Sequence, residues 1–120
     1  GDSGSGKSDL ALRLIDNGAT LISDDISICK KNSNNIYLYC PPEIKGLLEV
    51  REIGIITVPF VERIKLRLVV NLQSKNNERF PKDNYFRILG IKIPLISIEG
   101  KNSSAVAKIK VKLNEIRETI

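Results

Sequence analysis

The chain has 120 residues, of which 42% are hydrophobic and 28% charged, and its net charge is +5. This balance is typical of one globular domain with its own core, and the lack of an apolar run of about 18 residues argues against a membrane span. Because the basic residues are scattered and aromatic residues make up only 5%, the charge favours an anionic small ligand or an acidic protein over nucleic acid.

The first eight residues form a phosphate-binding motif, G-x-x-x-x-G-K-S. In such a loop the backbone N–H groups surround phosphate oxygens, Lys7 adds a positive charge, and the Ser8 hydroxyl binds Mg²⁺. The candidate nucleotide-binding residues are Gly1, Asp2, Ser3, Gly4, Ser5, Gly6, Lys7 and Ser8. The alternative is a Gly/Ser loop that only caps a helix. Since these loops follow a buried strand, we expect one or more upstream strands that this chain lacks.

Residues 8–17 have the apolar spacing of a helix, and Gly18 is placed to end it. Residues 20–23 are then expected to form a short strand that ends at Asp24 and Asp25. If this strand lies parallel to the one before the loop, both carboxylates face the bound phosphates. One carboxylate would then hold Mg²⁺ and the other would deprotonate a hydroxyl acceptor. The alternative is an Asp pair that caps a turn.

A hairpin is predicted next, from residues 26–31 and 36–40 around a polar loop. In this register Lys31 faces Ile36 and Cys29 faces Leu38. Cys29 and Cys40 are therefore not expected to form a disulfide, which favours a reducing cytoplasm.

The remaining segments complete an α/β domain with a mixed sheet, and we expect a single domain over residues 1–120. They are a short helix at 42–48, a buried strand at 53–58, a long strand at 62–72, a loop at 73–84, extended segments at 85–89 and 91–98, and a last helix capped by Ser103 or Ser104. The core face of that helix should hold Val106, Ile109, Leu113 and Ile116.

Glu49 and Arg51 precede an apolar strand, and on their own they indicate a solvated helix end or an ion pair. Together with the phosphate loop and the Ser-Asp-Asp turn, the segment Leu-Glu-Val-Arg at 48–51 nevertheless resembles the catalytic domain of the HPr kinase/phosphorylase family. The resemblance covers almost the whole chain, and the segment 103–109 is most similar to the short alphaproteobacterial form. It implies a phosphate-loop fold like that of phosphoenolpyruvate carboxykinase and the HPr kinase C-terminal domain.

The resemblance also implies a role for each matching residue. The loop would bind the phosphates of ATP or pyrophosphate, with Lys7 catalytic. Ser8 and Glu49 would bind Mg²⁺, and Asp24 would assist the metal site. Asp25 would accept the proton of an HPr serine during phosphorylation and return it when phosphoserine is attacked by phosphate.

Arg79 aligns with an arginine that the family uses in catalysis, although from the residues alone it is an exposed loop arginine. Arg51 would support the active-site region. Glu52 stands where the family has a glycine, which we expect to serve tight backbone packing. Its added carboxylate near Glu49 is expected to weaken activity or to change the choice of partner.

The resemblance implies an HPr-type phosphocarrier as the partner and a homo-oligomer, often a hexamer, as the assembly. Two other functions stay open from the residues: a kinase of a small metabolite, and a nucleotide-binding regulatory module without transfer activity. A protein acceptor needs a docking surface, whereas a metabolite needs a closed pocket. The sequence leaves open which carrier is the acceptor and whether the reverse reaction is physiological.

Overall fold

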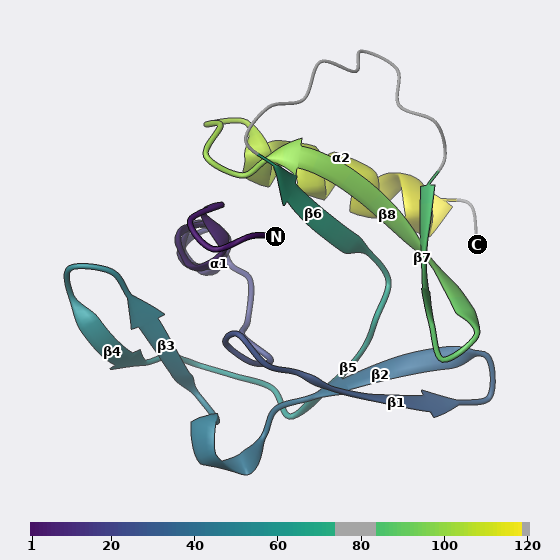
Figure 1. Ribbon diagram of the computed structural model, residues 1–120, viewed down its shortest axis with the longest axis horizontal. Coiled ribbons are helices and arrows are strands. Elements are labelled where there is room, and N and C mark those ends of the chain that lie inside the picture. Colours follow the sequence, from purple (N-terminus) through teal and green to yellow (C-terminus); the bar gives the residue numbers. More distant parts are fainter. Residues whose placement is uncertain (74–83, 119–120) are drawn as a thin grey trace.

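The computed structural model describes residues 1–73 and 84–118 (Figure 1). The helices are α1 (Lys7–Asp16) and α2 (Ala105–Glu118), with a 3₁₀ turn at Pro42–Ile44. The strands are β1 (Ile28–Asn32), β2 (Asn35–Tyr39), β3 (Leu47–Val50), β4 (Gly54–Thr57), β5 (Arg63–Lys65), β6 (Val69–Gln73), β7 (Asn84–Ile88) and β8 (Ile91–Glu99). No helix in the described ranges is both long and apolar enough to cross a bilayer.

The strands form separate sheets (Figure 1). In the mixed sheet, β8 lies between β6, to which it is parallel, and β7, to which it is antiparallel. The antiparallel sheet has the order β1–β2–β5, and β3 pairs with β4 as a hairpin. The expected α/β fold with a mixed sheet is confirmed.

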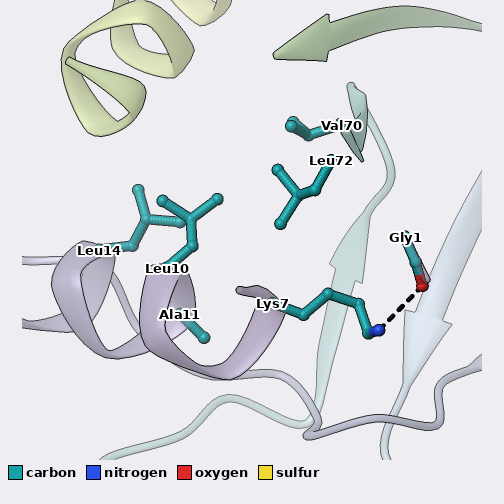
Figure 2. Close-up of a pocket in the computed structure, with 7 residues that line it drawn as sticks. All are labelled: Gly1, Lys7, Leu10, Ala11, Leu14, Val70 and Leu72. Atoms are coloured by element: carbon teal, nitrogen blue, oxygen red, sulfur yellow. Dashed lines mark hydrogen bonds between the residues drawn. The ribbon is translucent and has the colours of Figure 1, made fainter. Parts of the chain in front are cut away.

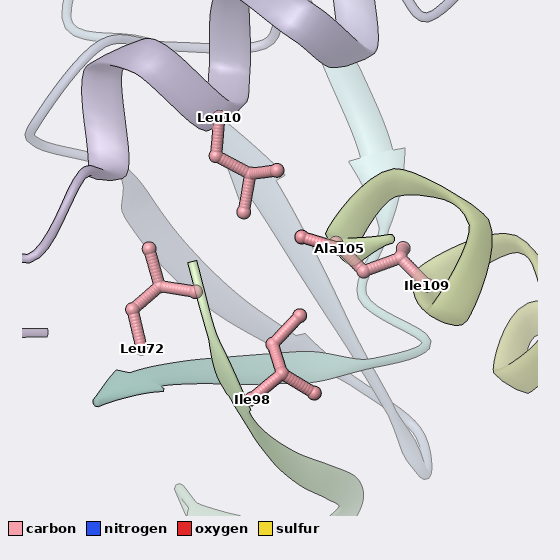
Figure 3. Close-up of a cluster of buried hydrophobic side chains, with 5 residues drawn as sticks. All are labelled: Leu10, Leu72, Ile98, Ala105 and Ile109. Atoms are coloured by element: carbon pink, nitrogen blue, oxygen red, sulfur yellow. The ribbon is translucent and has the colours of Figure 1, made fainter. Parts of the chain in front are cut away.

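The main core lies between the two helices and the mixed sheet (Figure 3). Leu10 of α1, Leu72 of β6, Ile98 of β8, and Ala105 and Ile109 of α2 are all at most 9% exposed. Burying one aliphatic side chain of this size stabilises a fold by about 1.5–3 kcal/mol. The phosphate loop precedes α1 directly, so this cluster also fixes where the loop sits.

The hairpin and the last helix follow the sequence-based predictions. Cys29 pairs with Leu38 and Lys31 with Ile36, as expected, and both cysteines are free thiols. Ile109 of α2 is buried, and Val106 and Leu113 pack beside it.

The predicted strand at residues 20–23 is wrong. Among residues 20–23, which are all described, only Leu21 forms a β-bridge, and its partner is Phe60. The Leu21 carbonyl also accepts the Val61 N–H at 2.9 Å. A strand needs a ladder of partners, and this segment has a single point of pairing. The helix predicted at 42–48 is also wrong beyond Ile44, because Leu47–Val50 pairs with β4 instead.

Two further sequence-based predictions, for the strands at 62–72 and 53–58, differ from the observed structure. The long strand at 62–72 is split: Arg63–Lys65 pairs with β2, whereas Val69–Gln73 pairs with β8. The strand at 53–58 exists as β4, but Ile53 and Ile55 are 73% and 71% exposed, so the predicted burial is wrong. A hairpin with only one neighbouring strand leaves part of its surface uncovered. Of the predicted loop at 73–84, residues 74–83 lie outside the described residues.

Candidate active site

The phosphate-binding motif forms a tight turn that leads into α1. Gly4 and Gly6 have φ values of 81° and 95°, a left-handed backbone that glycine adopts without steric cost. The Ser5 N–H donates to the Asp2 carbonyl at 3.1 Å, and the Leu10 N–H donates to the Gly6 carbonyl at 2.9 Å. The loop is therefore closed by its own backbone at the positive end of the helix, a favourable place for an anion.

Lys7 folds back over this loop (Figure 2). Its Nζ donates to the carbonyls of Gly1 at 2.8 Å and Asp2 at 3.1 Å, and the side chain is exposed. Hydrogen bonds from an ammonium to phosphate oxygens are stronger than those to neutral carbonyls. The Lys7 ammonium is thus held at the loop, where a phosphate would compete for it.

The turn that follows β8 contains Gly100 and packs against the phosphate loop at Ser5. A Cβ on Gly100 would lie 2.8 Å from Leu72 Cδ1 and 3.0 Å from the Ser5 carbonyl oxygen, so only glycine allows this approach. Arg13 of α1 holds the same turn by donating to the carbonyls of Gly100 and of Asn102, the latter at 3.2 Å. Sequence reasoning missed this support, because residues about 90 positions apart carry no local signal of contact.

A hollow of about 200 Å³ lies between α1 and β6 (Figure 2). Its lining residues are Gly1, Lys7, Leu10, Ala11, Leu14, Val70 and Leu72. Apart from Lys7 this lining is apolar or glycine, and apolar surface cannot replace the hydration of a phosphate. The geometry therefore favours a phosphate on the N–H side of the loop rather than inside the hollow.

The acidic turn and the Glu49 segment meet directly. Asp24 is half-buried, and its Oδ2 accepts the backbone N–H of Glu49 in β3 at 2.9 Å. Asp25 is exposed and has a φ of 65°. Because β3 also packs against α1, the helix behind the phosphate loop and the acidic segment belong to one contact region.

The structure joins only some of the expected site residues. Within residues 1–73 and 84–118, no hydrogen bond or ion pair links Asp24, Asp25 or Glu49 to Lys7 or Ser8. The same residues contain no cluster of three acidic, Cys or His side chains that could hold a metal. Arg79 lies outside the described residues.

The donor chemistry nevertheless fits Mg²⁺. Ser8 and Glu49 are both exposed and offer a hydroxyl and a carboxylate. Mg²⁺ takes oxygen ligands, and it is usually bound through one or two carboxylates plus substrate phosphates and water. Ser8 and Glu49 thus carry oxygen groups of the kind that Mg²⁺ takes as ligands.

Glu52 lies at the tip of the β3–β4 hairpin. Its φ is 74°, and the Ile53 N–H donates to the Val50 carbonyl at 3.0 Å to close the turn. The expected reason for a glycine here was tight packing, but the residue is exposed. The left-handed backbone at this turn position is one that favours glycine. Arg51 is exposed at the same tip and forms no ion pair with any described residue.

The glycine loop, the helix behind it and the mixed sheet define an α/β domain of the phosphate-loop class. The family model for the HPr serine kinase C-terminal domain matches residues 1–118, and the chain belongs to this family.

Curated relatives agree with this assignment. The HPr kinase/phosphorylase of Ralstonia pickettii (strain 12J) is 33% identical over 132 residues, which cover 98% of this chain and 41% of the relative. That of Caldicellulosiruptor bescii is 34% identical over 125 residues, covering 91% of this chain and 40% of the relative. The chain thus spans about two fifths of the length of these relatives. Its similarity to the short alphaproteobacterial form stays a prediction.

A solved structure has the same fold. The HPr(Ser) kinase/phosphatase from Coxiella burnetii superposes with a TM-score of 0.84 at 27% sequence identity. The superposition covers 98% of this chain and 85% of that chain.

Proposed function

We propose that this chain is the catalytic part of a cytoplasmic enzyme that phosphorylates a serine of an HPr-type phosphocarrier with ATP and Mg²⁺, and that removes the phosphate by phosphorolysis. The observation that carries the proposal is the meeting of two motifs: the closed phosphate loop before α1, and the Asp24–Glu49 contact on β3, which packs against α1. Membership of the HPr serine kinase family supports it.

In the forward reaction, the serine hydroxyl oxygen attacks the γ-phosphorus of ATP and the bond to ADP breaks. Asp25 accepts the hydroxyl proton. Lys7 and the loop N–H groups stabilise the charge on the transferred phosphoryl group. Mg²⁺ held by Ser8 and Glu49 would neutralise part of the phosphate charge.

In the reverse reaction, an oxygen of inorganic phosphate attacks the phosphorus of phosphoserine and pyrophosphate forms. Asp25 returns the proton to the serine oxygen as it leaves. The same residues serve both directions because both reactions transfer one phosphoryl group between the same positions.

The exposure of the acidic residues favours a protein acceptor over a small metabolite. Asp25 and Glu49 are open to solvent, and the hollow beside the loop is lined mostly by apolar side chains. A metabolite kinase needs a concave pocket in which a few polar groups converge on the acceptor hydroxyl, and neither Asp25 nor Glu49 lines the hollow. A folded protein instead brings its own surface to cover an open site.

Intact mass spectrometry tests the proposal. The protein at its natural length is incubated with Mg-ATP and an HPr-type carrier from the same organism, and the carrier with its target serine changed to alanine is the control. We expect one added phosphate on the first carrier and none on the control, and its loss with pyrophosphate formation when inorganic phosphate is added. ATP binding without any carrier modification would overturn the proposal in favour of a metabolite kinase or a regulatory module.

A further inference from the structure

The backbone at Asp25 is in a sparsely populated conformation. The Ile26 N–H donates to the Asp24 carbonyl at 2.7 Å, which closes a three-residue γ-turn with Asp25 at its centre. Asp25 has a φ of 65°, and a γ-turn with positive φ at its central residue is rare and strained. Such strain persists only when neighbouring interactions hold the backbone in place.

Two side chains, both from residues that precede Asp25, hold this turn. The Ser23 hydroxyl donates to the Ile26 carbonyl across the turn. The Asp24 carboxylate accepts the Glu49 N–H at 2.9 Å and so fixes the turn to β3. Asp24 is half-buried whereas Asp25 is exposed, which leaves the Asp25 carboxylate open to an acceptor.

The Asp24 contact links two parts of the chain that are 25 positions apart. Glu49 lies opposite Ile55 in the β3–β4 hairpin, and its N–H is directed to Asp24. A hydrogen bond from a backbone N–H to a carboxylate is charge-assisted and is stronger than one to a neutral oxygen. This contact therefore sets where the strained turn sits relative to the Glu49 side chain.

We propose that Asp24 is a positioning residue, which holds the Asp25 turn against β3 so that Asp25 and Glu49 keep a fixed separation. The inference rests on the proposed function and differs from the metal-assisting role that the family resemblance implies. In the positioning role, Asp24 needs an oxygen that accepts the Glu49 N–H, and its negative charge is secondary. In a metal-assisting role, Asp24 needs its negative charge. A substitution that keeps the oxygen and removes the charge therefore distinguishes the two roles.

The test compares Asp24→Ala and Asp24→Asn in the protein at its natural length, with Asp16→Ala as a control for loss of an exposed carboxylate on α1. Asparagine keeps an oxygen that accepts the Glu49 N–H, whereas alanine does not. Three quantities are measured: hydrogen exchange at the Glu49 amide without ligand, kcat and KM for carrier phosphorylation, and the Mg²⁺ concentration for half-maximal rate.

For Asp24→Ala we expect faster exchange at the Glu49 amide and a fall in kcat on the order of 100-fold, because a displacement of about 1 Å at a reacting group costs that much. The KM for the carrier changes much less. For Asp24→Asn we expect the amide to stay protected, the rate to recover to within about tenfold of the wild type, and the Mg²⁺ requirement to stay the same. Asp24→Asn is isosteric and carries the test alone if Asp24→Ala does not fold.

An unchanged Glu49 amide in Asp24→Ala would overturn the proposal, since the contact would then not hold the turn. The proposal would also be overturned if Asp24→Asn keeps the Glu49 amide protected but loses much of the rate and needs more Mg²⁺. That result would favour a metal-assisting role for the Asp24 charge. If the wild-type protein itself transfers no phosphate, the proposed function fails, and the exchange measurement alone decides whether Asp24 fixes the turn.

Discussion

The phosphate loop and the acidic turn both use left-handed backbone, but they place different residues there. In the loop these positions are Gly4 and Gly6, with φ of 81° and 95°. In the turns that surround Glu49 they are Asp25 and Glu52, with φ of 65° and 74°. A non-glycine residue in this region costs roughly 1–2 kcal/mol, whereas glycine adopts it freely.

The choice of residue at these positions follows from what each segment is proposed to contribute, which is backbone N–H groups in the loop and a side chain in the acidic turn. Phosphates are bound by N–H groups, so the loop gains from glycines that expose its backbone. In the proposed reaction Asp25 is the proton acceptor, a role that glycine could not fill, and its strained turn is held by Ser23 and Asp24. At Glu52 no side chain among the described residues holds the turn in this way, and the strain there has no comparable support.

Loss of Lys7 from the phosphate loop should reduce carrier phosphorylation more than any other substitution proposed for the loop or the hairpin. Lys7→Ala removes the cation that now donates to the Gly1 and Asp2 carbonyls. We expect carrier phosphorylation to fall on the order of 10³-fold, because loss of one preorganised donor at a developing charge has that effect. ATP affinity, measured by calorimetry, should fall as well. Asp16→Ala on the same helix removes an exposed carboxylate and is the control. An equal loss in that variant would contradict a specific role for Lys7.

Gly100→Ala tests how the loop is supported. The new Cβ would meet Leu72 Cδ1 at 2.8 Å and the Ser5 carbonyl at 3.0 Å. We expect the free energy of unfolding to fall by about 1–3 kcal/mol, as for overpacking in a core, and ATP affinity to fall with it. Gly90→Ala, in the β7–β8 turn, has no atom within 4 Å of its Cβ and serves as the control. That variant should lose stability through its backbone alone and keep its ATP affinity. Retained ATP affinity in Gly100→Ala would contradict the support assigned to this turn.

The smallest expected effect is at the hairpin tip. Glu52→Gly relieves the left-handed strain but raises the entropy of the unfolded chain, so we expect a net gain of about 0.5–1 kcal/mol in the free energy of unfolding. Urea denaturation measures it. Glu52→Ala removes the carboxylate and keeps the strain, so it should not gain stability. If both variants gain equally, the side chain and not the backbone is the cause.

The sequence predicted the parts of the fold that depend on local pattern. The β1–β2 register follows from the polar turn between two apolar runs, and α1 follows from its apolar spacing. The split at residues 62–72 could not be predicted, because a continuous alternating pattern does not show that its two halves pair with different sheets. The phosphate loop was visible as a motif. The Asp24–Glu49 contact and the Arg13 support depend on tertiary pairing, and no local spacing indicates them.

We propose that Asp25 occupies a strained turn because its carboxylate is needed as the proton acceptor. The most direct test measures both urea unfolding and carrier phosphorylation in Asp25→Gly and Asp25→Ala. Both variants should lose transfer by about 10²–10⁴-fold, as for removal of a general base. Asp25→Gly should also be more stable than Asp25→Ala by about 1 kcal/mol, because only glycine relieves the positive φ. Equal stability of the two variants, or near-normal transfer in either, would contradict the claim.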